Sequence, residues 1–477
     1  MSDLAREQFF DHCQHGLDLL IIGGGISGAG LLWLASLNGW RAALIEQSDF
    51  AYGSSSRSSK LIHGGLRYLP QGHWRLTREA VRERENLRAL FPAIESLRFH
   101  LPFRRQAPIS HSLGLWLYDV FAGRKSRDTF KMIAEIFPEI SSVENLSSLS
   151  YLDAASDDAG LVIEVLKRAE ACGGLAQNYV TATELLFQHD KVIGVNVRDE
   201  LNGECTEIRA RHIVEATGAW QGLHHALSET LRLKPLRGSH WVLPFHLFPC
   251  SQALAFKHPD DGRYVYAMPW QGCTLFGTTD VGHTAGMTTE PHISVNESAY
   301  LQCALQHHFP YRDWRPSDCL STMAGVRPTV DDGAISADDI SRELVIRHQP
   351  GYSQLKGGKL TTFLASAEKL LGEVATEIGK KHNIQRPAPD RTTKKPDAQR
   401  SVGRIAVSGC DYQVRHLDDF LLRRSRLGNT LRNGGLRELE ALRPLLQQRW
   451  QWSDQRWQQE QLRYLQIWQR SYAPVAS

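Results

Sequence analysis

Hydrophobic and polar positions in the first fifty residues follow an order that predicts a βαβ unit. Leu17 to Ile22 form an apolar run of strand length, and Ala29 to Leu37 form one of helical length that Asn38 and Gly39 end. A second strand-like run follows from Arg41 to Ile45. Strands that are apolar at every position are typical of a parallel sheet buried on both faces, so we expect an α/β domain here.

The pattern changes further along the chain. Residues 74–91 and 161–171 have the periodicity of helices, whereas residues 191–199 alternate as a strand does. Strand-like segments dominate residues 236–350, which favours a mostly antiparallel sheet. A long helix is expected after "GGKLTTF", capped by Thr361 or Thr362, and residues 412–470 are helical in pattern.

Bulk composition limits the classes of function. The 477 residues have a formal net charge of +3, which argues against nucleic-acid binding. Residues 381–477 carry 18 Lys and Arg against nine Asp and Glu, so this part is either a solvated helical surface or a face for an anionic membrane. The apolar segment "LGLWLYDVF", Leu113 to Phe121, is either core or an interfacial patch.

Cysteines and termini indicate a cytoplasmic protein. The eight cysteines include no CxxC pair, so we expect no metal site and no disulfide framework. The first 16 residues lack the pattern of a signal peptide, and no stretch approaches the roughly 18 apolar residues of a spanning helix.

Glycines between the first strand and helix predict a dinucleotide site. Gly23, Gly25 and Gly28 form GxGxxG, and Glu46 closes the second strand 18 residues after the third glycine. The first glycine permits the tight turn, the second lets a pyrophosphate approach the backbone, and the third lets helix and strand pack closely. The helix N-terminus faces the phosphates, and Glu46 can accept hydrogen bonds from a ribose. The motif alone leaves NAD and FAD open.

Residues 54–69, "SSSRSSKLIHGGLRYL", combine serines, glycines and cations, a composition that suits an anion as well as an ordinary loop. With "GGGISGAG", "DDAGL", "ATGAW", "GSHWVLP", "GTTD", "GVRPTVDD" and "GGKLTTF" in this order, the chain resembles the FAD-dependent glycerol-3-phosphate dehydrogenases over residues 17 to 370. Departures are Gly160 where the family has Arg, Ala219 where it has Pro, and a shorter segment before "VRHLDDFLLRRSRLG".

The resemblance implies an α/β fold with a Rossmann-like FAD-binding domain, an inserted, mostly antiparallel β substrate domain and a small C-terminal helical domain. The expected parts are residues 1–100 and 151–225 for FAD binding, 101–150 for a helical excursion of the substrate domain, 226–320 for the substrate domain, 321–382 for a return segment with the long helix, 383–400 for a linker and 401–477 for the helical region.

The implied reaction is oxidation of the C2 hydroxyl of sn-glycerol 3-phosphate to dihydroxyacetone phosphate, with hydride transfer to flavin N5. His240 is our choice of base, with Arg327 stabilising the alkoxide, although the sequence leaves open which group takes the proton. Lys359 is expected to stabilise the reduced flavin. Arginine matches phosphate oxygens bidentately, so the expected substrate contacts are Arg67, Tyr68, Arg327, Arg342 and His240.

The FAD contacts implied by the matched motifs are Gly23, Gly25, Ile26, Ser27, Gly28, Glu46, Ser54, Ser55, Ser58, Ser59, Lys60, Leu61, His63, Gly64, Gly65, Gly218, Gly358, Lys359, Thr361 and Thr362. Arg57 has no role that the sequence indicates.

Partners and rival functions follow from the same resemblance. Quinone or another acceptor is expected to take the electrons, and attachment to the cytoplasmic membrane face and a homodimer are both left open. One alternative is a flavin-dependent enzyme for an amino acid, an N-methyl amino acid or another phosphorylated polyol. The other is a flavin-binding partner protein without turnover.

Overall fold

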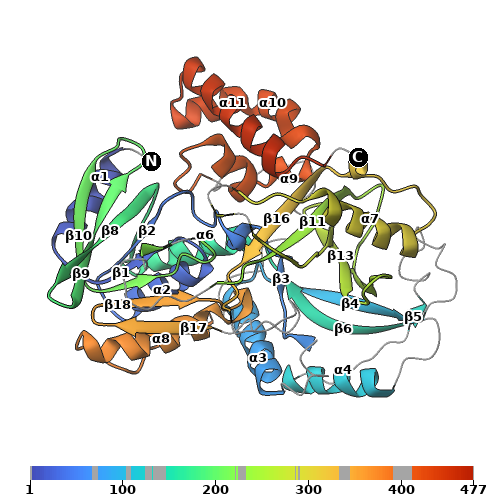
Figure 1. Ribbon diagram of the computed structural model, residues 1–477, viewed down its shortest axis with the longest axis horizontal. Coiled ribbons are helices and arrows are strands. Elements are labelled where there is room, and N and C mark those ends of the chain that lie inside the picture. The colour runs from blue at the N-terminus through green and yellow to red at the C-terminus, as the bar shows by residue number, and fades with distance from the viewer. Residues whose placement is uncertain are drawn as a thin grey trace.

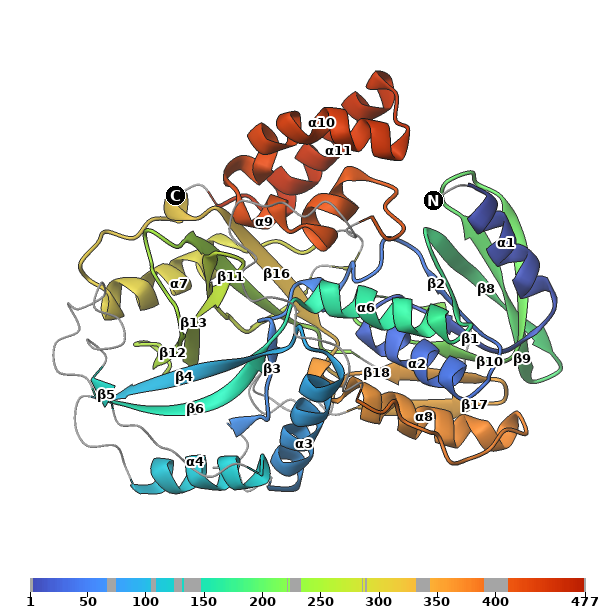
Figure 2. The same ribbon diagram turned by 180° about the vertical axis from the view of Figure 1, so that it is seen from behind.

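The computed structural model describes residues 3–66, 74–103, 109–123, 131–132, 147–220, 222–223, 233–284, 286–287, 290–331, 344–389 and 411–475. Two sheets lie side by side in these residues, and the C-terminal helices lie across one side of the junction between them (Figures 1 and 2). This arrangement confirms the predicted α/β class with a second, β-rich part and a helical C-terminal region.

The first sheet contains the predicted βαβ unit. Its strands, as far as the chain is described, are β1 (Leu17–Ile22), β2 (Ala42–Glu46), β7 (Leu175–Asn178), β8 (Val180–Gln188), β9 (Lys191–Asp199), β10 (Cys205–Glu215), β17 (Val345–Gln349) and β18 (Tyr352–Lys356). Strand β1 pairs in parallel with β2 and β10, and β18 pairs in parallel with β10. The carboxyl ends of β1, β10 and β18 therefore meet at one edge, where ligands of such sheets bind.

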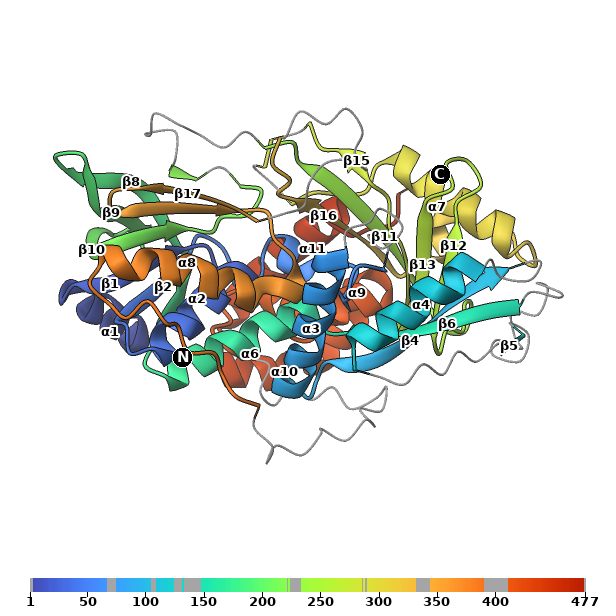
Figure 3. The same ribbon diagram turned by 90° about the horizontal axis from the view of Figure 1, so that it is seen from below.

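Burial on both faces explains the unbroken apolar run of β1. Leu19 and Ile21 pack into the cluster that contains α2 (Ile26–Leu37), α6 (Asp158–Ala171) and α8 (Phe363–Glu377). Leu20 and Ile22 point to the other face, where they join α1 (Asp3–Gln14) and strands β8 to β10. Figure 3 shows α2 and α8 running alongside each other.

The second sheet is antiparallel except for a short parallel contact between β4 and β12. Its described strands are β3 (Leu61–Ile62), β4 (Glu95–Phe103), β5 (Lys131–Met132), β6 (Ser147–Ala155), β11 (Leu236–Pro244), β12 (Ala253–Lys257), β13 (Tyr264–Trp270), β14 (Cys273–Gly277), β15 (Val281–Gly282) and β16 (Ser321–Arg327). Helices α3 (Trp74–Leu90), α4 (Ile109–Phe121) and α7 (Val295–His308) accompany it. No helix in the described parts of the chain is both long and apolar enough to cross a lipid bilayer.

The C-terminal unit, residues 411–475, contains a π-helical turn (Asp419–Arg424) and helices α9 (Leu427–Thr430), α10 (Leu436–Trp450) and α11 (Asp454–Ser471). Trp457, Tyr464 and Trp468 of α11 are buried in one cluster with Met323 of the second sheet. The unit is therefore packed onto the body of the protein by large aromatic side chains.

Several boundaries differ from those expected. Strands β3, β4 and β6 belong to the second sheet, although most of their residues fall in the parts expected to bind FAD. The start of the expected linker is packed: Arg386 pairs with Glu83 and Glu368, whereas residues 390–400 lie outside the described residues. The pairing of β3 and β4 with β6, and a salt bridge between residues 303 positions apart, leave no local signal in a sequence.

Candidate active site

A cavity of about 470 Å³ lies where the edges of the two sheets meet. Three loops at the carboxyl ends of β1, β10 and β18 supply one wall: Gly23 to Ser27, Ala216 to Gly218 and Gly357 to Thr361. The second sheet supplies His240 and Arg327. The cavity therefore brings together segments that are more than 300 residues apart in the chain.

The glycine turn at the start of α2 leaves its N-terminus open to the cavity. Gly23 has φ +115°, and a Cβ there would lie 2.5 Å from the carbonyl oxygen of Ala216. A Cβ on Gly28 would lie 1.9 Å from the carbonyl oxygen of Gly23, so Gly28 serves packing and is absent from the cavity wall. Gly25 is the N-cap residue and provides no side-chain cap, which leaves backbone N–H groups available to an anion.

Glu46 stands at the end of β2 on the cavity wall. Its carboxylate accepts hydrogen bonds from the backbone N–H groups of Gly24 (2.6 Å) and Ser48 (2.9 Å). Burial raises the pKa of Glu46, and the two N–H donors oppose that rise. Each carboxylate oxygen keeps a lone pair, so the group can accept a ribose hydroxyl as the motif predicts.

The serine run performs several different tasks. Ser54 donates to the carbonyl oxygen of Val326, and Ser55 Oγ accepts from the N–H of Ile26 at 3.0 Å. Ser58 donates through N–H and Oγ to Asp158. Ser59 Oγ lies 3.0 Å from His240 Nε2. These four serines and Leu61 line the cavity.

Lys60, expected to bind the cofactor, instead points into the protein. Its ammonium is buried and donates to Asp158 and, at 2.6 Å, to the carbonyl oxygen of Ser56. The left-handed backbone of Lys60, with φ +61°, turns the side chain away from its neighbours. Burial lowers the pKa of Lys60 to about 8, although Asp158 opposes the shift.

The segment from His63 to Gly65 is held against Thr361, which precedes α8. The N–H of His63 donates to Thr361 Oγ1 at 3.1 Å, and the hydroxyl donates back to the carbonyl oxygen of His63 at 3.2 Å. His63, Gly65 and Thr361 line the cavity. Gly64 does not, because its N–H donates to the Tyr118 hydroxyl (2.7 Å) and its α-carbon faces that ring.

His240 is a buried histidine in the middle of β11. It pairs with Gly277 of β14, where a Cβ would lie 2.6 Å from the imidazole. Burial lowers the pKa of His240 to about 3, and the charges of Lys60 and Arg327 act in the same direction. The imidazole is therefore neutral at working pH.

Arg327 ends β16 and is one quarter exposed on the cavity wall. Its Nη1 donates to Asp280 Oδ1 at 2.9 Å, and Arg263 pairs with the other oxygen of Asp280. A Cβ on Gly238 would lie 2.6 Å from the Arg327 guanidinium. The absence of a side chain at position 238 thus leaves room for the guanidinium in the cavity.

Lys359 and Gly358 also line the cavity, but α8 begins only at Phe363. The expected side-chain cap is wrong: Thr362 holds the N-cap position without a side-chain hydrogen bond and lies off the cavity wall, while Thr361 Oγ1 is engaged with His63. Three predicted residues, Arg67, Tyr68 and Arg342, lie outside the described residues.

Arg57, which the sequence left without a role, is buried. It pairs with Glu290 at 2.9 Å and donates to the Tyr472 hydroxyl at 2.7 Å. It therefore joins the serine run to the C-terminal unit.

Further residues that line the cavity were not predicted: Tyr52, Asp153, Tyr151, Phe99, Tyr266, Trp220 and Thr278. Of these, Trp220 and Thr278 stand inside the motifs "ATGAW" and "GTTD" and were available from the sequence.

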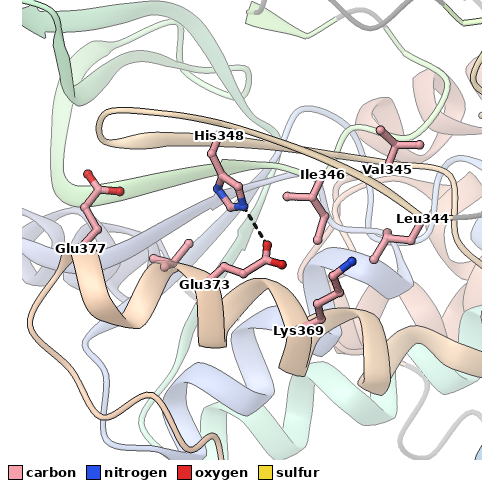
Figure 4. A pocket seen from close by; sticks show the side chains of 8 residues that line it. Leu344, Val345, Ile346, His348, Lys369, Glu373 and Glu377 are labelled. Atoms are coloured by element: carbon pink, nitrogen blue, oxygen red, sulfur yellow. Dashed lines mark hydrogen bonds and ion pairs between the residues drawn. The ribbon is translucent and has the colours of Figure 1, made fainter.

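Two other clusters do not form comparable sites. A hollow of about 510 Å³ lies between β17 and α8, but its histidine, His348, already pairs with Glu373 at 2.7 Å (Figure 4). His258, Asp260 and Cys303 have metal-like spacing. Both ring nitrogens of His258 are engaged, however, one with the Asp260 N–H and one with the Tyr300 carbonyl oxygen.

Comparisons with known proteins agree with this geometry. A family model described as FAD dependent oxidoreductase matches residues 18–364. The aerobic glycerol-3-phosphate dehydrogenase of Staphylococcus haemolyticus is 34% identical over 401 residues, which cover 80% of this chain and 72% of the relative.

Solved structures show the same relationship. The glycerol-3-phosphate dehydrogenase from Bacillus halodurans complexed with FAD has a TM-score of 0.64 and 28% identity, covering 80% of this chain and 68% of that chain. A glycine oxidase from Bacillus cereus has a TM-score of 0.55 and 16% identity over 78% of this chain and 100% of its own, a likeness that shows the fold alone.

Proposed function

The chain belongs to the FAD-dependent glycerol-3-phosphate dehydrogenases, and from this premise we propose that its cavity oxidises the C2 hydroxyl of sn-glycerol 3-phosphate to dihydroxyacetone phosphate. The observation that carries the proposal is the meeting of the glycine turn, Glu46, His240 and Arg327 around one cavity. A dinucleotide-binding edge and a base with a cation are the groups that such an oxidation needs.

The residues present fit FAD. The N-terminus of α2, whose N-cap residue provides no side-chain cap, suits the pyrophosphate, and a Cβ on Gly23 would strike the carbonyl oxygen of Ala216, so glycine keeps this turn close to the end of β10. Glu46 suits the ribose, while Ser54, Ser55 and the segment from His63 to Gly65 continue along the cavity. When bound, the flavin supplies a hydride acceptor at N5.

The protein's own residues then carry the polar part of the reaction. Arg327 binds the substrate through its guanidinium and orients it, since a planar fork matches both phosphate and alkoxide oxygens. His240 accepts a proton at Nε2 from the hydroxyl of the cavity-lining Ser59, 3.0 Å away, and that hydroxyl takes the C2 hydroxyl proton of the substrate in exchange. Lys359, on the wall beside Gly358, offers positive charge where negative charge develops. Arg67, Tyr68 and Arg342 complete the proposed substrate contacts by motif.

Anaerobic mixing with substrates tests the reaction. We expect sn-glycerol 3-phosphate to bleach the flavin absorbance of the loaded protein, with glycerol and sarcosine much slower. Reduction by sarcosine but not by glycerol 3-phosphate would assign the site to amine oxidation, which the shared fold also supports. A flavin that no substrate reduces would make the chain a binding protein without turnover.

The electrons leave to an acceptor, and we propose a quinone reached at the membrane surface. Helix α4 exposes Trp116 (47%) and Val120 (46%), and α3 begins with the exposed Trp74 (49%). The two helices lie next to each other along the lower side of the molecule in Figure 1. Aromatic side chains beside aliphatic ones are suited to an interfacial position. The C-terminal helices lie on the opposite side of the molecule in Figure 1, so attraction of the basic C-terminal part to anionic lipid would be a separate contact. A homodimer is a further proposal, with sedimentation as its test.

We expect Trp116→Ala to weaken binding to anionic vesicles roughly 10- to 150-fold, because burying one large apolar side chain is worth roughly 1.5–3 kcal/mol. Phe187→Ala is the matched control, since Phe187 is equally exposed (47%) on β8 of the first sheet. Co-sedimentation at low and high salt separates the two contributions: binding by the apolar patch persists in salt, and binding by the basic part does not. Equal losses for both variants would contradict the assignment to α4.

A further inference from the structure

Asp158, at the start of α6, is a buried carboxylate that organises the loop from Ser58 to Lys60. Its Oδ2 accepts from the N–H (3.0 Å) and the hydroxyl (2.7 Å) of Ser58, and the Lys60 ammonium lies 2.9 Å from both oxygens. Burial alone would raise the pKa of Asp158, but Lys60 and Arg426 hold it below its usual value. The aspartate is therefore charged and ties down both ends of the loop.

The C-terminal unit reaches the same carboxylate through Arg426. This buried arginine donates through Nη2 to Asp158 Oδ1 at 2.8 Å and through Nε to Asp157 Oδ1 at 2.9 Å. Its third donor, Nη1, is satisfied by the carbonyl oxygen of Leu422 at 2.5 Å. The side chain is thus held from both sides, and its fork spans two consecutive aspartates 268 residues away in the sequence.

Ser59 lies between the two residues that Asp158 holds. Lys60 donates to the carbonyl oxygen of Ser56 as well as to Asp158, which sets the backbone of the loop on either side of Ser59. Ser59 Oγ in turn lies 3.0 Å from His240 Nε2. Three contacts therefore connect a C-terminal arginine with the proposed base: Arg426 with Asp158, Asp158 with the loop from Ser58 to Lys60, and Ser59 with His240.

We propose that Arg426 and Asp158 are positioning residues for the oxidation: through the Ser58–Lys60 loop they hold Ser59 against His240 and so set the orientation of the imidazole. This inference rests on the proposed function of His240 as the base. It gives the C-terminal unit a task in the reaction, although none of its residues is placed at the reacting atoms. Replacing Arg426 leaves Asp157 and Asp158 with one cation fewer in a buried site, so the loop is expected to move.

The test is the rate of anaerobic flavin reduction at saturating sn-glycerol 3-phosphate, per bound flavin. Arg426→Gln and Asp158→Asn are expected to lower this rate by roughly 10²-fold, since displacements of about 1 Å cost that much, while the substrate concentration at half-saturation changes little. Arg426→Lys keeps the charge and loses the planar guanidinium, so we expect it to recover part of the rate.

Arg424→Gln is the matched control: Arg424 is a buried arginine of the same unit but pairs with Asp49, next to β2. We expect it to lower stability and to leave the rate per flavin unchanged.

A double-mutant cycle with His240→Gln separates positioning from a general loss of structure. If Arg426 acts through His240, Arg426→Gln has no further effect in the His240→Gln background. An equal slowing in both backgrounds, or an unchanged rate in Arg426→Gln, overturns the inference. Should Arg426→Gln fail to fold, Ser58→Ala removes one Asp158 contact from the loop side and enters the same cycle.

Side-chain NMR of His240 in the loaded protein provides a readout without substrate. We expect Arg426→Gln to shift the Nε2 resonance and Arg424→Gln to leave it unchanged, and an unshifted resonance in Arg426→Gln contradicts the inference. A wild-type flavin that glycerol 3-phosphate does not reduce would refute the proposed function, while this NMR comparison would still test the connection between Arg426 and His240.

Discussion

Replacing Arg327 by alanine is expected to slow flavin reduction by sn-glycerol 3-phosphate about 10²–10³-fold, the loss found when one donor to a developing oxyanion is removed. Arg327 stands at the end of β16 with its guanidinium on the cavity wall, and its Nη1 donates to Asp280 Oδ1 at 2.9 Å. The absence of a side chain at Gly238 leaves room for the guanidinium there. Flavin content should stay near that of the wild type, because the glycine turn and Glu46, proposed to hold the pyrophosphate and ribose, belong to the first sheet.

Two comparison variants separate function from structure. Arg237→Ala removes an arginine from the neighbouring strand β11 that pairs with the buried Glu297 and is absent from the cavity wall. We expect it to lower stability without slowing reduction. Arg327→Lys keeps the charge but loses the fork, so it should fall between wild type and alanine. Parallel loss of flavin and of rate in Arg327→Ala would make Arg327 structural.

The substrate itself distinguishes the two tasks that Arg327 can perform. Glycerol lacks the phosphate and keeps the C2 hydroxyl. If Arg327 binds the phosphate, the variant loses rate with glycerol 3-phosphate and not with glycerol. If it stabilises the alkoxide, both substrates lose rate by the same factor.

Local patterns carried much of the fold and of the cofactor side of the site. The run from Leu17 to Glu46 predicted strand, turn, helix and strand because apolar length and glycine placement are local properties. His240 and Arg327 line one cavity as expected, and they were found through motifs and not through any periodicity. Their shared cavity depends on β11 pairing with β16 in register, which no single segment encodes.

Buried charges were the part that the sequence concealed. Lys60 was expected to bind the cofactor, Arg57 had no role that the sequence indicated, and Arg426 is one of 18 basic residues in the C-terminal part. Their partners, Asp158, Glu290 and Asp157, are 98 to 269 residues away. A charge that will be buried and one that will be solvated have the same local signature, so only the tertiary fold separates them.

Replacing His240 by glutamine is expected to lower flavin reduction about 10²–10⁴-fold, the usual contribution of a general base. Glutamine keeps an amide near Ser59 but has no nitrogen that accepts a proton. His212→Gln is the matched control: His212 is also buried, donates or accepts at Ser353 Oγ (2.7 Å), and is absent from the cavity wall. Rates at saturating substrate, per bound flavin, should separate the two variants by at least tenfold. Equal rates would remove His240 from the reaction.

The pH dependence of the free energy of unfolding, in contrast to the rate, should change in the same way in both variants. Burial lowers the pKa of His240 to about 3 and that of His212 to about 4, whereas an unfolded histidine titrates near 6.5. Between these values the unfolded chain binds a proton that the native protein does not, so the free energy of unfolding falls as the pH falls from about 6.5. Each histidine contributes a slope of about 1.4 kcal/mol per pH unit, and each glutamine variant should lose one such contribution in urea unfolding between pH 6 and 4.5.

The wild-type rate should show no titration of His240 between pH 5 and 8. Both variants thus share a stability signature, and only His240→Gln changes the rate, because only His240 meets the cavity. A His240→Gln variant with the wild-type slope would show that the native imidazole binds its proton over the same pH range as the unfolded chain, which contradicts a lowered pKa of His240.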